Sequence, residues 1–323
     1  MNKLILIKNA ELFQGEKYLN KSRNYFEGWY FKNVNSQKGI SFIPGISINN
    51  EDAKAFIQII TNEVSYFVDY NIKDFEFNYS PFYIKIGDNS FSKSEVNINI
   101  EKKFIKIYGN IKYSDSQNIS TNILAPNIMG PFSYLPFMEC NHAIISMQNT
   151  INGSININDE IINFSNDKGY IEKDWGNSFP KTYIWCQGNN FSKENASFMF
   201  SIADIPFGIF SFKGFICDLL IDNEEFKFTT YNNANLINYE VKDDSFNITF
   251  KKNIYLLNIK SKNSKGLKLI APVNGKMKKD IVQSISTSVI VTLKKNEKII
   301  FCDTSEMCGL EIVKNESNCN KKI

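Results

Sequence analysis

The sequence predicts an all-β protein built from antiparallel sheets. Hydrophobic residues recur with a period of two through most of the chain, and turn-forming residues separate these alternating runs at hairpin spacing. Helical periodicity is hard to find. An antiparallel sheet with one buried and one wet face explains the alternation, and such sheets close into barrels or pack as sandwiches to remove their edges.

The alternating runs indicate strands in the following order along the chain: Val96 to Ile100, Ile105 to Ile107, Ile155 to Ile157, Phe198 to Ile202, Phe246 to Phe250 and Ile285 to Leu293. Turn signals stand between them at Gly87 to Asn89, Ser114 to Ser116, Asn158 to Asp159, Asp222 to Asn223 and Lys294 to Glu297. Aromatic-rich strand pairs are expected at Ser65 to Phe77 and Ile209 to Phe228.

The length of 323 residues favours two domains, because single hydrophobic cores usually stop growing at about 250 to 300 residues. An internal echo supports two similar halves: Trp29-Tyr30-Phe31 and Trp185-Cys186-Gln187 each precede an alternating run. Chance recurrence in a chain rich in Phe and Tyr explains the echo equally well. We place the boundary near residue 166, which gives β-domains at 1–165 and 166–323.

Composition excludes several classes of protein. The net charge of +3 comes from 37 basic and 34 acidic residues spread along the chain, so no basic footprint for nucleic acid stands out. Six cysteines without a CxxC pair and a single histidine predict no metal site. The apolar run near the start has only four residues, too short for a signal peptide or a membrane span, and we expect a cytoplasmic protein.

His142 is the first candidate for chemistry. If the segment from Asn141 to Gln148 is extended, His142 shares a face with the even-numbered residues that follow, and Glu139 comes just before it. A histidine and a carboxylate this close could transfer protons. A buried histidine that only donates a hydrogen bond to a backbone carbonyl is an equally good reading.

The stretch from Gly169 to Phe191 carries two of the three tryptophans beside acidic residues. Alternation puts Glu172 and Asp174 on one face and Trp175 on the other. We expect the carboxylates to point into an aromatic-lined barrel, where loss of solvent raises the pKa of a carboxyl and makes it a proton donor. Pointing outward they would be surface charges. The tryptophans could equally close the barrel end and pack its core.

The chain resembles the tocopherol cyclase family at Tyr25 to Lys32, Gly130 to Met147, Gly169 to Phe191 and Cys308 to Glu311. The resemblance implies two lipocalin-like antiparallel β-barrel or sandwich domains in tandem. It also implies a cyclisation without cofactor: a side-chain alkene of a prenylated hydroquinone is protonated, and the phenol oxygen captures the cation. Such chemistry needs an acid beside an apolar alkene, aromatic faces and exclusion of water. Plant members carry organelle-targeting extensions, whereas we expect none here, and the substrate of this chain is left open.

Matching the family's motifs gives two sets of site residues. The expected proton-transfer residues are Glu172, Asp174 and His142, with Glu139 and Asp204 behind them. The residues expected to line the ligand cavity are Trp29, Tyr30, Trp175, Trp185 and Gln187.

The expected partner is a hydrophobic small molecule, cyclised or hydrated by an isomerase-type or intramolecular-lyase reaction. The alternative is a carrier that binds such a molecule without changing it, which barrel cavities do readily. The segments from Pro131 to Met138 and from Ile205 to Phe212 are aromatic enough to touch a membrane surface, although burial in core strands explains them at least as well.

Overall fold

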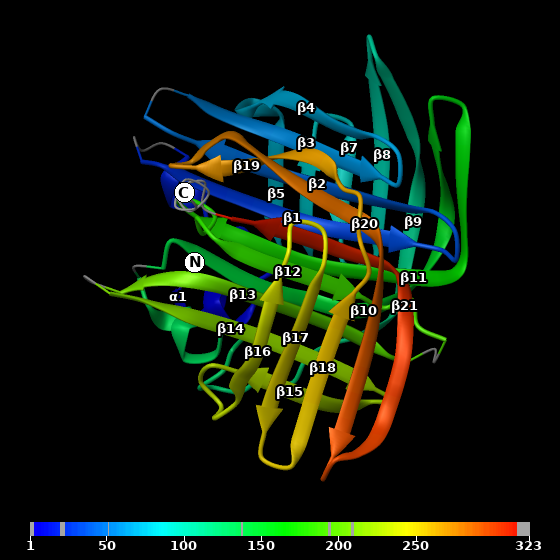
Figure 1. The fold of residues 1–323 in the computed structure, drawn as a ribbon. Helices are drawn as coiled ribbons and strands as arrows, with labels where there is room; N and C mark the ends of the chain where they lie inside the picture. Colours follow the sequence, from blue (N-terminus) through cyan, green and yellow to red (C-terminus); the bar gives the residue numbers. More distant parts are fainter. Residues whose placement is uncertain are drawn as a thin grey trace, which may run out of the picture. The chain divides into compact units, whose positions relative to one another are not determined.

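A computed structural model describes residues 3–19, 23–50, 52–136, 138–192, 195–207 and 210–314 (Figure 1). The chain divides into two compact units. Unit 1 comprises Met1–Phe179 together with Leu269–Asp280, and unit 2 comprises Pro180–Lys268 together with Ile281–Ile323. The predicted all-β class is confirmed, because two antiparallel sheets account for nearly all of the regular structure.

Unit 1 is built on an eleven-stranded, nearly closed sheet in the order β4-β3-β2-β1-β11-β10-β9-β8-β7-β6-β5. Its strands are β1 (Tyr25–Val34), β2 (Gly39–Ile48), β3 (Ala53–Thr61), β4 (Ser65–Asn71), β5 (Phe75–Tyr79), β6 (Phe82–Ile86), β7 (Asn89–Ser92), β8 (Glu95–Lys102), β9 (Ile105–Gln117), β10 (Cys140–Ile157) and β11 (Glu160–Gly176). Short helices are α1 (Lys3–Lys8), η1 (Glu16–Tyr18), η2 (Ile72–Asp74) and η3 (Gly130–Tyr134). No helix in the described ranges is long and apolar enough to cross a membrane.

The second sheet runs in the order β15-β14-β13-β12-β21-β20-β18-β17-β16, with β19 paired to β20. Its strands are β12 (Tyr183–Gly188), β13 (Ser197–Phe207), β14 (Phe210–Ile221), β15 (Glu224–Thr229), β16 (Asn235–Val241), β17 (Phe246–Lys252), β18 (Tyr255–Ser261), β19 (Leu267–Val273), β20 (Lys276–Lys295) and β21 (Lys298–Val313). The tip of the β19–β20 hairpin, Leu269–Asp280, belongs to unit 1.

Residue 166, where the sequence places the domain boundary, lies inside β11. This strand pairs with β1 on one side and β10 on the other, so its hydrogen bonds keep it in unit 1. The compact units separate after Phe179, in the segment that follows β11.

The core of each unit is formed by the side chains on one face of its strands. Trp29 and Ile171 are fully buried in the unit 1 core, and Cys186 and Phe198 are fully buried in the unit 2 core. Because Cys186 faces the core, its neighbour Trp185 projects from the opposite face of β12. Trp29 and Trp185 therefore lie on different faces of their sheets, although the two sequence runs look alike.

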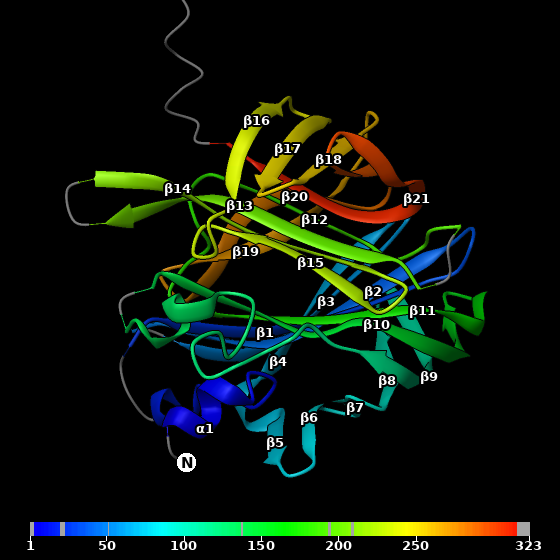
Figure 2. The same ribbon diagram turned by 90° about the horizontal axis from the view of Figure 1, so that it is seen from below.

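A fully buried ion pair attaches the N-terminal segment to unit 1. Lys173 Nζ lies 2.5 Å from Glu27 Oε1, and both side chains have no solvent exposure. Lys173 also donates to the carbonyl oxygens of Ala10 at 2.8 Å and Leu12 at 2.6 Å. The Gln14 amide donates to Glu27 Oε1 at 2.8 Å. The N-terminal residues, which lie below β1 and beside β5 in Figure 2, are thus bound to β1 and β11 through polar contacts inside the core.

Aromatic rings complete the surroundings of this ion pair. Lys173 Nζ lies 5.0 Å from the ring centroid of Trp29 and 4.7 Å from that of Trp175, so both indoles stabilise its charge. Tyr25 donates to Glu27 Oε2 at 2.6 Å. Burial lowers the pKa of Lys173, while the contact with Glu27 opposes that effect.

Alkaline titration is expected to unfold unit 1. Burial raises the pKa of Tyr25, Tyr113 and Tyr170 above the ordinary value of about 10, and the neighbouring carboxylates Glu27 and Glu172 add to the shift for Tyr25 and Tyr170. The unfolded chain loses these protons near pH 10 and the folded chain keeps them. Their contribution to stability is therefore present below about pH 10 and is lost as the pH rises further.

Phenolate absorbance followed together with circular dichroism tests this expectation. The three buried tyrosines should ionise only as the β-sheet signal disappears. Reversible ionisation of all 15 tyrosines near pH 10 with the fold intact would contradict it.

Candidate active site

The middle of the unit 1 sheet brings three ionisable side chains together. In the register of β10 and β11, His142 lies opposite Asp174 and Ile144 lies opposite Glu172. Residues two apart on a strand share a face, so Glu172 and Asp174 project from the same side of β11. His142, which lies opposite Asp174, projects from that same face of the sheet. On the other neighbour of β11, Tyr30 of β1 lies opposite Glu172.

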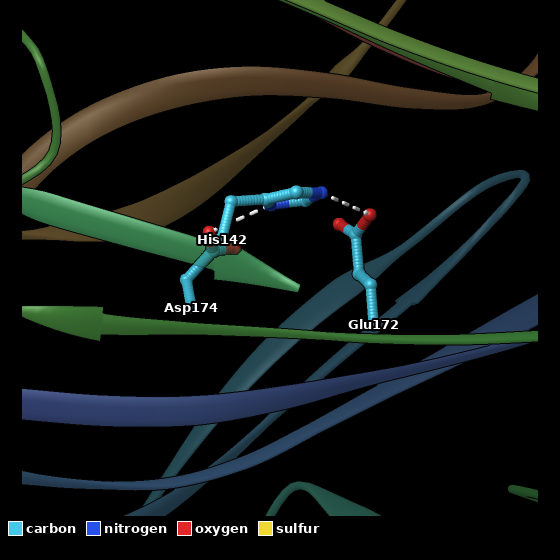
Figure 3. Close-up of side chains that lie close together, drawn as sticks. All are labelled: His142, Glu172 and Asp174. Atoms are coloured by element: carbon cyan, nitrogen blue, oxygen red, sulfur yellow. Dashed lines mark hydrogen bonds and ion pairs between the residues drawn. The ribbon is translucent and has the colours of Figure 1, made fainter. Parts of the chain in front are cut away.

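The imidazole of His142 lies between the two carboxylates (Figure 3). Its Nδ1 is 2.9 Å from Asp174 Oδ1, and its Nε2 is 3.4 Å from Glu172 Oε2. The side chain of Glu172 is 5% exposed, that of His142 12% and that of Asp174 24%. The cluster is therefore a chain of polar contacts running from a partly exposed carboxylate to a buried one.

Tyr170 extends this chain by donating its hydroxyl to Glu172 Oε2 at 2.5 Å. Burial, and then the charge of Glu172, raise the pKa of Tyr170 well above its usual range, so the phenol stays protonated and remains a donor. Burial and the charge of Asp174 likewise raise the pKa of the nearby Cys140 thiol. Cys140 is therefore a neutral neighbour and not a thiolate nucleophile.

The three residues also form a group that a metal ion could use. One potential ligand atom from each of His142, Glu172 and Asp174 lies within 4.8 Å of the others. Each imidazole nitrogen faces a different carboxylate, however, and the Nδ1 to Oδ1 distance is that of a hydrogen bond. The arrangement favours proton transfer along the cluster.

The expected direction of the acidic side chains is wrong. Ile171 packs in the unit 1 core and Trp175 packs against that core, so Glu172 and Asp174 project from the opposite face of β11. The interior of the sheet is lined by Trp29, Phe31 and other apolar side chains. The acids are nonetheless sheltered from solvent, so the desolvation expected for Glu172 is present on the other face.

The residues expected to line a cavity in unit 1 divide between the two faces of its sheet. Trp29 is buried in the core and donates its Nε1 hydrogen to the carbonyl of Glu11 at 2.8 Å. Trp175 packs against the same core. Tyr30 is buried on the His142 face, where its hydroxyl accepts a hydrogen bond from Ser41 at 3.1 Å. Of these three, Tyr30 is the residue that lies beside the acidic cluster.

Glu139 precedes β10, and its backbone has a clear structural role. Its carbonyl accepts a hydrogen bond from the backbone amide of Asn177 at 2.9 Å, which joins the residue before β10 to the segment that follows β11. Gly176 has φ of +154°, and a Cβ there would lie 2.3 Å from that carbonyl oxygen. Glycine is therefore required where the two chain segments cross.

The remaining expected site residues lie in unit 2. Asp204 forms an ion pair with Lys213 at 2.8 Å across β13 and β14, and both side chains are exposed. Trp185 and Gln187 are buried on the face of β12 that is opposite to its core. Their neighbour Glu311 accepts hydrogen bonds from Tyr183 at 2.7 Å and Gln283 at 2.9 Å.

Tyr170 and Glu311 did not enter the candidate set from sequence. The sequence could have indicated Tyr170, since the period of two places it on the same face as Glu172 and Asp174. Glu311 lies in the Cys308 to Glu311 motif, but its partners come from distant strands, and spacing alone does not indicate them.

Comparisons with known proteins agree with the fold. The crystal structure of CghA is similar with a TM-score of 0.55 at 6% identity, over 90% of this chain and 89% of that one. The crystal structure of kievitone hydratase from Nectria haematococca gives a TM-score of 0.50 at 10% identity, again over 90% of this chain and 89% of that one. At such identities the likeness shows the fold alone. A search of curated protein sequences found no match.

The family comparison covers the candidate site itself. The sequence model described as tocopherol cyclase-like matches residues 116–313, which include β10, β11 and the whole His142, Glu172 and Asp174 cluster. Because the match spans more than half of the chain, the protein belongs to the tocopherol cyclase-like family.

Proposed function

We propose that this protein is an enzyme that protonates an alkene of a hydrophobic isoprenoid or prenylated hydroquinone and lets an oxygen nucleophile add to the resulting cation. The observation that carries the proposal is the imidazole of His142 held between the carboxylates of Asp174 and Glu172 on a sheltered face. His142 is the single histidine of the chain, and histidine is the side chain most often used for general acid and base catalysis.

The three residues have distinct roles in the proposed reaction. Asp174 accepts a hydrogen bond from Nδ1–H and fixes the orientation of the ring, which leaves Nε2 toward Glu172. A proton taken from solvent at the partly exposed Asp174 end passes through His142 to the carboxyl of Glu172. Tyr170 holds that carboxyl in place.

Glu172 then delivers its proton to the alkene. The π electron pair forms the new C–H bond, and the adjacent carbon becomes a tertiary cation. A phenol oxygen of the same molecule, or a water molecule, donates an electron pair to that carbon and forms the C–O bond. The proton released from the oxygen returns to the Glu172 carboxylate, so the enzyme ends in its starting state. Burial of Glu172 keeps bulk water from capturing the cation first.

Two outcomes of this chemistry remain open to the same site. Ring closure by the phenol gives an isomer of the substrate, which is an isomerase-type or intramolecular-lyase reaction. Addition of water gives a hydrated product, and kievitone hydratase, which shares the fold, is by its name a hydratase. The substrate decides between them by offering or lacking a phenol within reach of the cation.

Incubation of the purified protein with a prenylated hydroquinone, followed by mass and ultraviolet analysis, tests the proposal. A chromanol has the mass of its substrate with a changed spectrum, and a hydrated product is heavier by one water molecule. Either product supports the enzyme. Recovery of unchanged ligand bound to the protein would instead support the non-catalytic carrier.

We also propose that the protein takes its ligand from a membrane surface through the β13–β14 hairpin. Phe210, the first residue of β14, is 74% exposed, and an exposed aromatic side chain suits the headgroup region of a bilayer. Replacing Phe210 with serine should reduce co-sedimentation with phosphatidylcholine vesicles. Phe104→Ser, at a side chain that is 80% exposed in the turn between β8 and β9, is the matched control and should have no effect. Equal losses in both variants, or no sedimentation of the wild type, would reject the hairpin as the contact.

A further inference from the structure

The cluster of His142, Glu172 and Asp174 has the composition of a metal site as well as that of a proton path. One potential ligand atom from each residue lies within 4.8 Å of the others. The sequence predicts no metal site, because it has one histidine and no CxxC pair. The pairing of β10 with β11 nonetheless brings that histidine to two carboxylates, and imidazole nitrogen and carboxylate oxygen are both zinc ligands.

The distance between His142 Nε2 and Glu172 Oε2 is that of two ligands on one zinc ion. The atoms lie 3.4 Å apart, beyond the usual hydrogen-bond range of about 2.7 to 3.2 Å. Zinc bonds to nitrogen and oxygen are about 2.0 to 2.2 Å long, so two ligands of a tetrahedral ion lie about 3.3 to 3.5 Å apart. Neighbouring ligands of an octahedral magnesium ion lie closer, about 2.9 Å apart, and are oxygens. The pair therefore suits zinc and not magnesium.

Each of these two side chains has the kind of outer partner that metal ligands usually have. A histidine that binds a metal through one nitrogen commonly donates the hydrogen of the other to a carboxylate, which fixes its tautomer and orientation. His142 Nδ1 lies 2.9 Å from Asp174 Oδ1, and with its hydrogen there the ring offers the lone pair of Nε2. Glu172 accepts the hydroxyl of Tyr170 at 2.5 Å, and metal-binding carboxylates are likewise held by hydrogen bonds.

A small ion can reach this position from solvent. The side chain of Asp174 is 24% exposed and that of His142 12%, so the Asp174 end of the cluster is open to water. Water molecules complete the ligands of a four-coordinate ion held by two side chains. Binding is therefore expected to be weaker than in a closed site of four protein ligands.

We propose that His142 Nε2 and Glu172 Oε2 bind a zinc ion, with Asp174 as the hydrogen-bond partner that orients the imidazole. The site follows from the geometry of the cluster and does not depend on turnover. Its effect on turnover rests on the proposed function: zinc takes the Nε2 lone pair through which the proton passes, so a bound ion blocks the path to Glu172.

Zinc binding to chelator-treated protein, measured by isothermal titration calorimetry, tests this site. His142→Gln and Glu172→Gln each remove a direct ligand. Each should weaken binding by more than about 100-fold, since loss of an outer partner already costs about 10 to 100-fold. Asp174→Asn keeps an oxygen acceptor for Nδ1–H without its charge, and should weaken binding by about 10 to 100-fold.

Three control variants should bind zinc like the wild type. Glu76→Gln makes the same change as Glu172→Gln at an exposed side chain. Cys302→Ser removes an exposed thiol that could hold zinc by itself. Cys140→Ser removes the thiol near the cluster, whose Sγ lies 3.9 Å from Asp174 Oδ1 and is not one of the proposed ligands. Melting temperatures show which variants are folded.

A wild type that binds no zinc would overturn the site, as would unchanged binding in a folded His142→Gln or Glu172→Gln protein. Loss of binding in Cys140→Ser or Cys302→Ser would also overturn it, because a thiol would then be the ligand. If both ligand variants unfold, unchanged affinity in Asp174→Asn decides against the site. Binding is read without turnover, so a protein that converts no substrate loses the proposed function and still passes or fails this test.

Discussion

Replacing Lys173 with methionine is expected to lower the free energy of unfolding of unit 1 by about 3 to 5 kcal/mol, the cost of leaving a buried charge without its partner. Methionine fills most of the volume but leaves Glu27 buried without its cation. It also removes the donor from the carbonyls of Ala10 and Leu12. Urea unfolding followed by tryptophan fluorescence measures the change, because Trp29 and Trp175 lie against the ammonium.

Lys85→Met is the matched control for this prediction. Lys85 forms an ion pair with Glu76 at 2.8 Å, at a similar distance to the buried pair, but the two side chains are 37% and 62% exposed. Exposed ion pairs contribute about 0 to 1 kcal/mol, so this variant should unfold almost like the wild type. A Lys173→Met variant no less stable than Lys85→Met would show that the N-terminal segment is held by its apolar contacts alone.

Turnover is expected to fall by about 10² to 10⁴-fold in Glu172→Gln and in His142→Gln, the usual contribution of a general acid or base. Glutamine at 172 keeps the size of the side chain and can still accept the hydroxyl of Tyr170 through its amide oxygen, but it cannot deliver a proton. Glutamine at 142 removes the group that connects Asp174 to Glu172. Product formation from a prenylated hydroquinone measures both variants.

The control for the acid variants is Glu76→Gln, the same chemical change at a 62% exposed side chain on β5. It should turn over substrate at the wild-type rate. Melting temperatures of all three variants separate lost chemistry from lost structure. A folded Glu172→Gln protein with wild-type turnover would remove Glu172 from the mechanism, whereas unfolding of both site variants would favour the purely structural reading of the cluster.

Alternation in the sequence was sufficient to predict the fold class and to group Glu172 with Asp174. A hydrophobic period of two indicates which residues share a face of a strand. Phe198 and Phe200 lie together in a core, as their spacing predicts. It does not state which face a neighbouring part of the chain covers. The acids were therefore grouped correctly but assigned to the wrong side of β11, since both faces of this strand are buried around Ile171 and Glu172.

Contacts between distant segments were beyond the reach of the sequence. The closeness of His142 to Asp174 depends on the register of β10 against β11, which a β-bulge between Ile144 and Ser146 shifts within the same strand pair. The ion pair of Lys173 with Glu27 joins β11 to β1, and no local sequence pattern predicts that these two strands are neighbours in the sheet. Trp29 and Trp185 stand in similar sequence runs, but Trp29 lies on the core face of its sheet and Trp185 on the non-core face of its own. The place of a residue in an alternating run does not fix whether the odd or the even positions face the core.

Reaction in deuterium oxide tests the central claim, that the His142, Glu172 and Asp174 cluster transfers a solvent-derived proton to carbon. Asp174 is partly exposed, so the cluster exchanges its protons with solvent before turnover. We expect one deuterium per product molecule, bound to the carbon next to the new C–O bond, and formation of this product about 10² to 10⁴-fold more slowly in Glu172→Gln. Product formed by the wild type without deuterium on carbon would contradict the account.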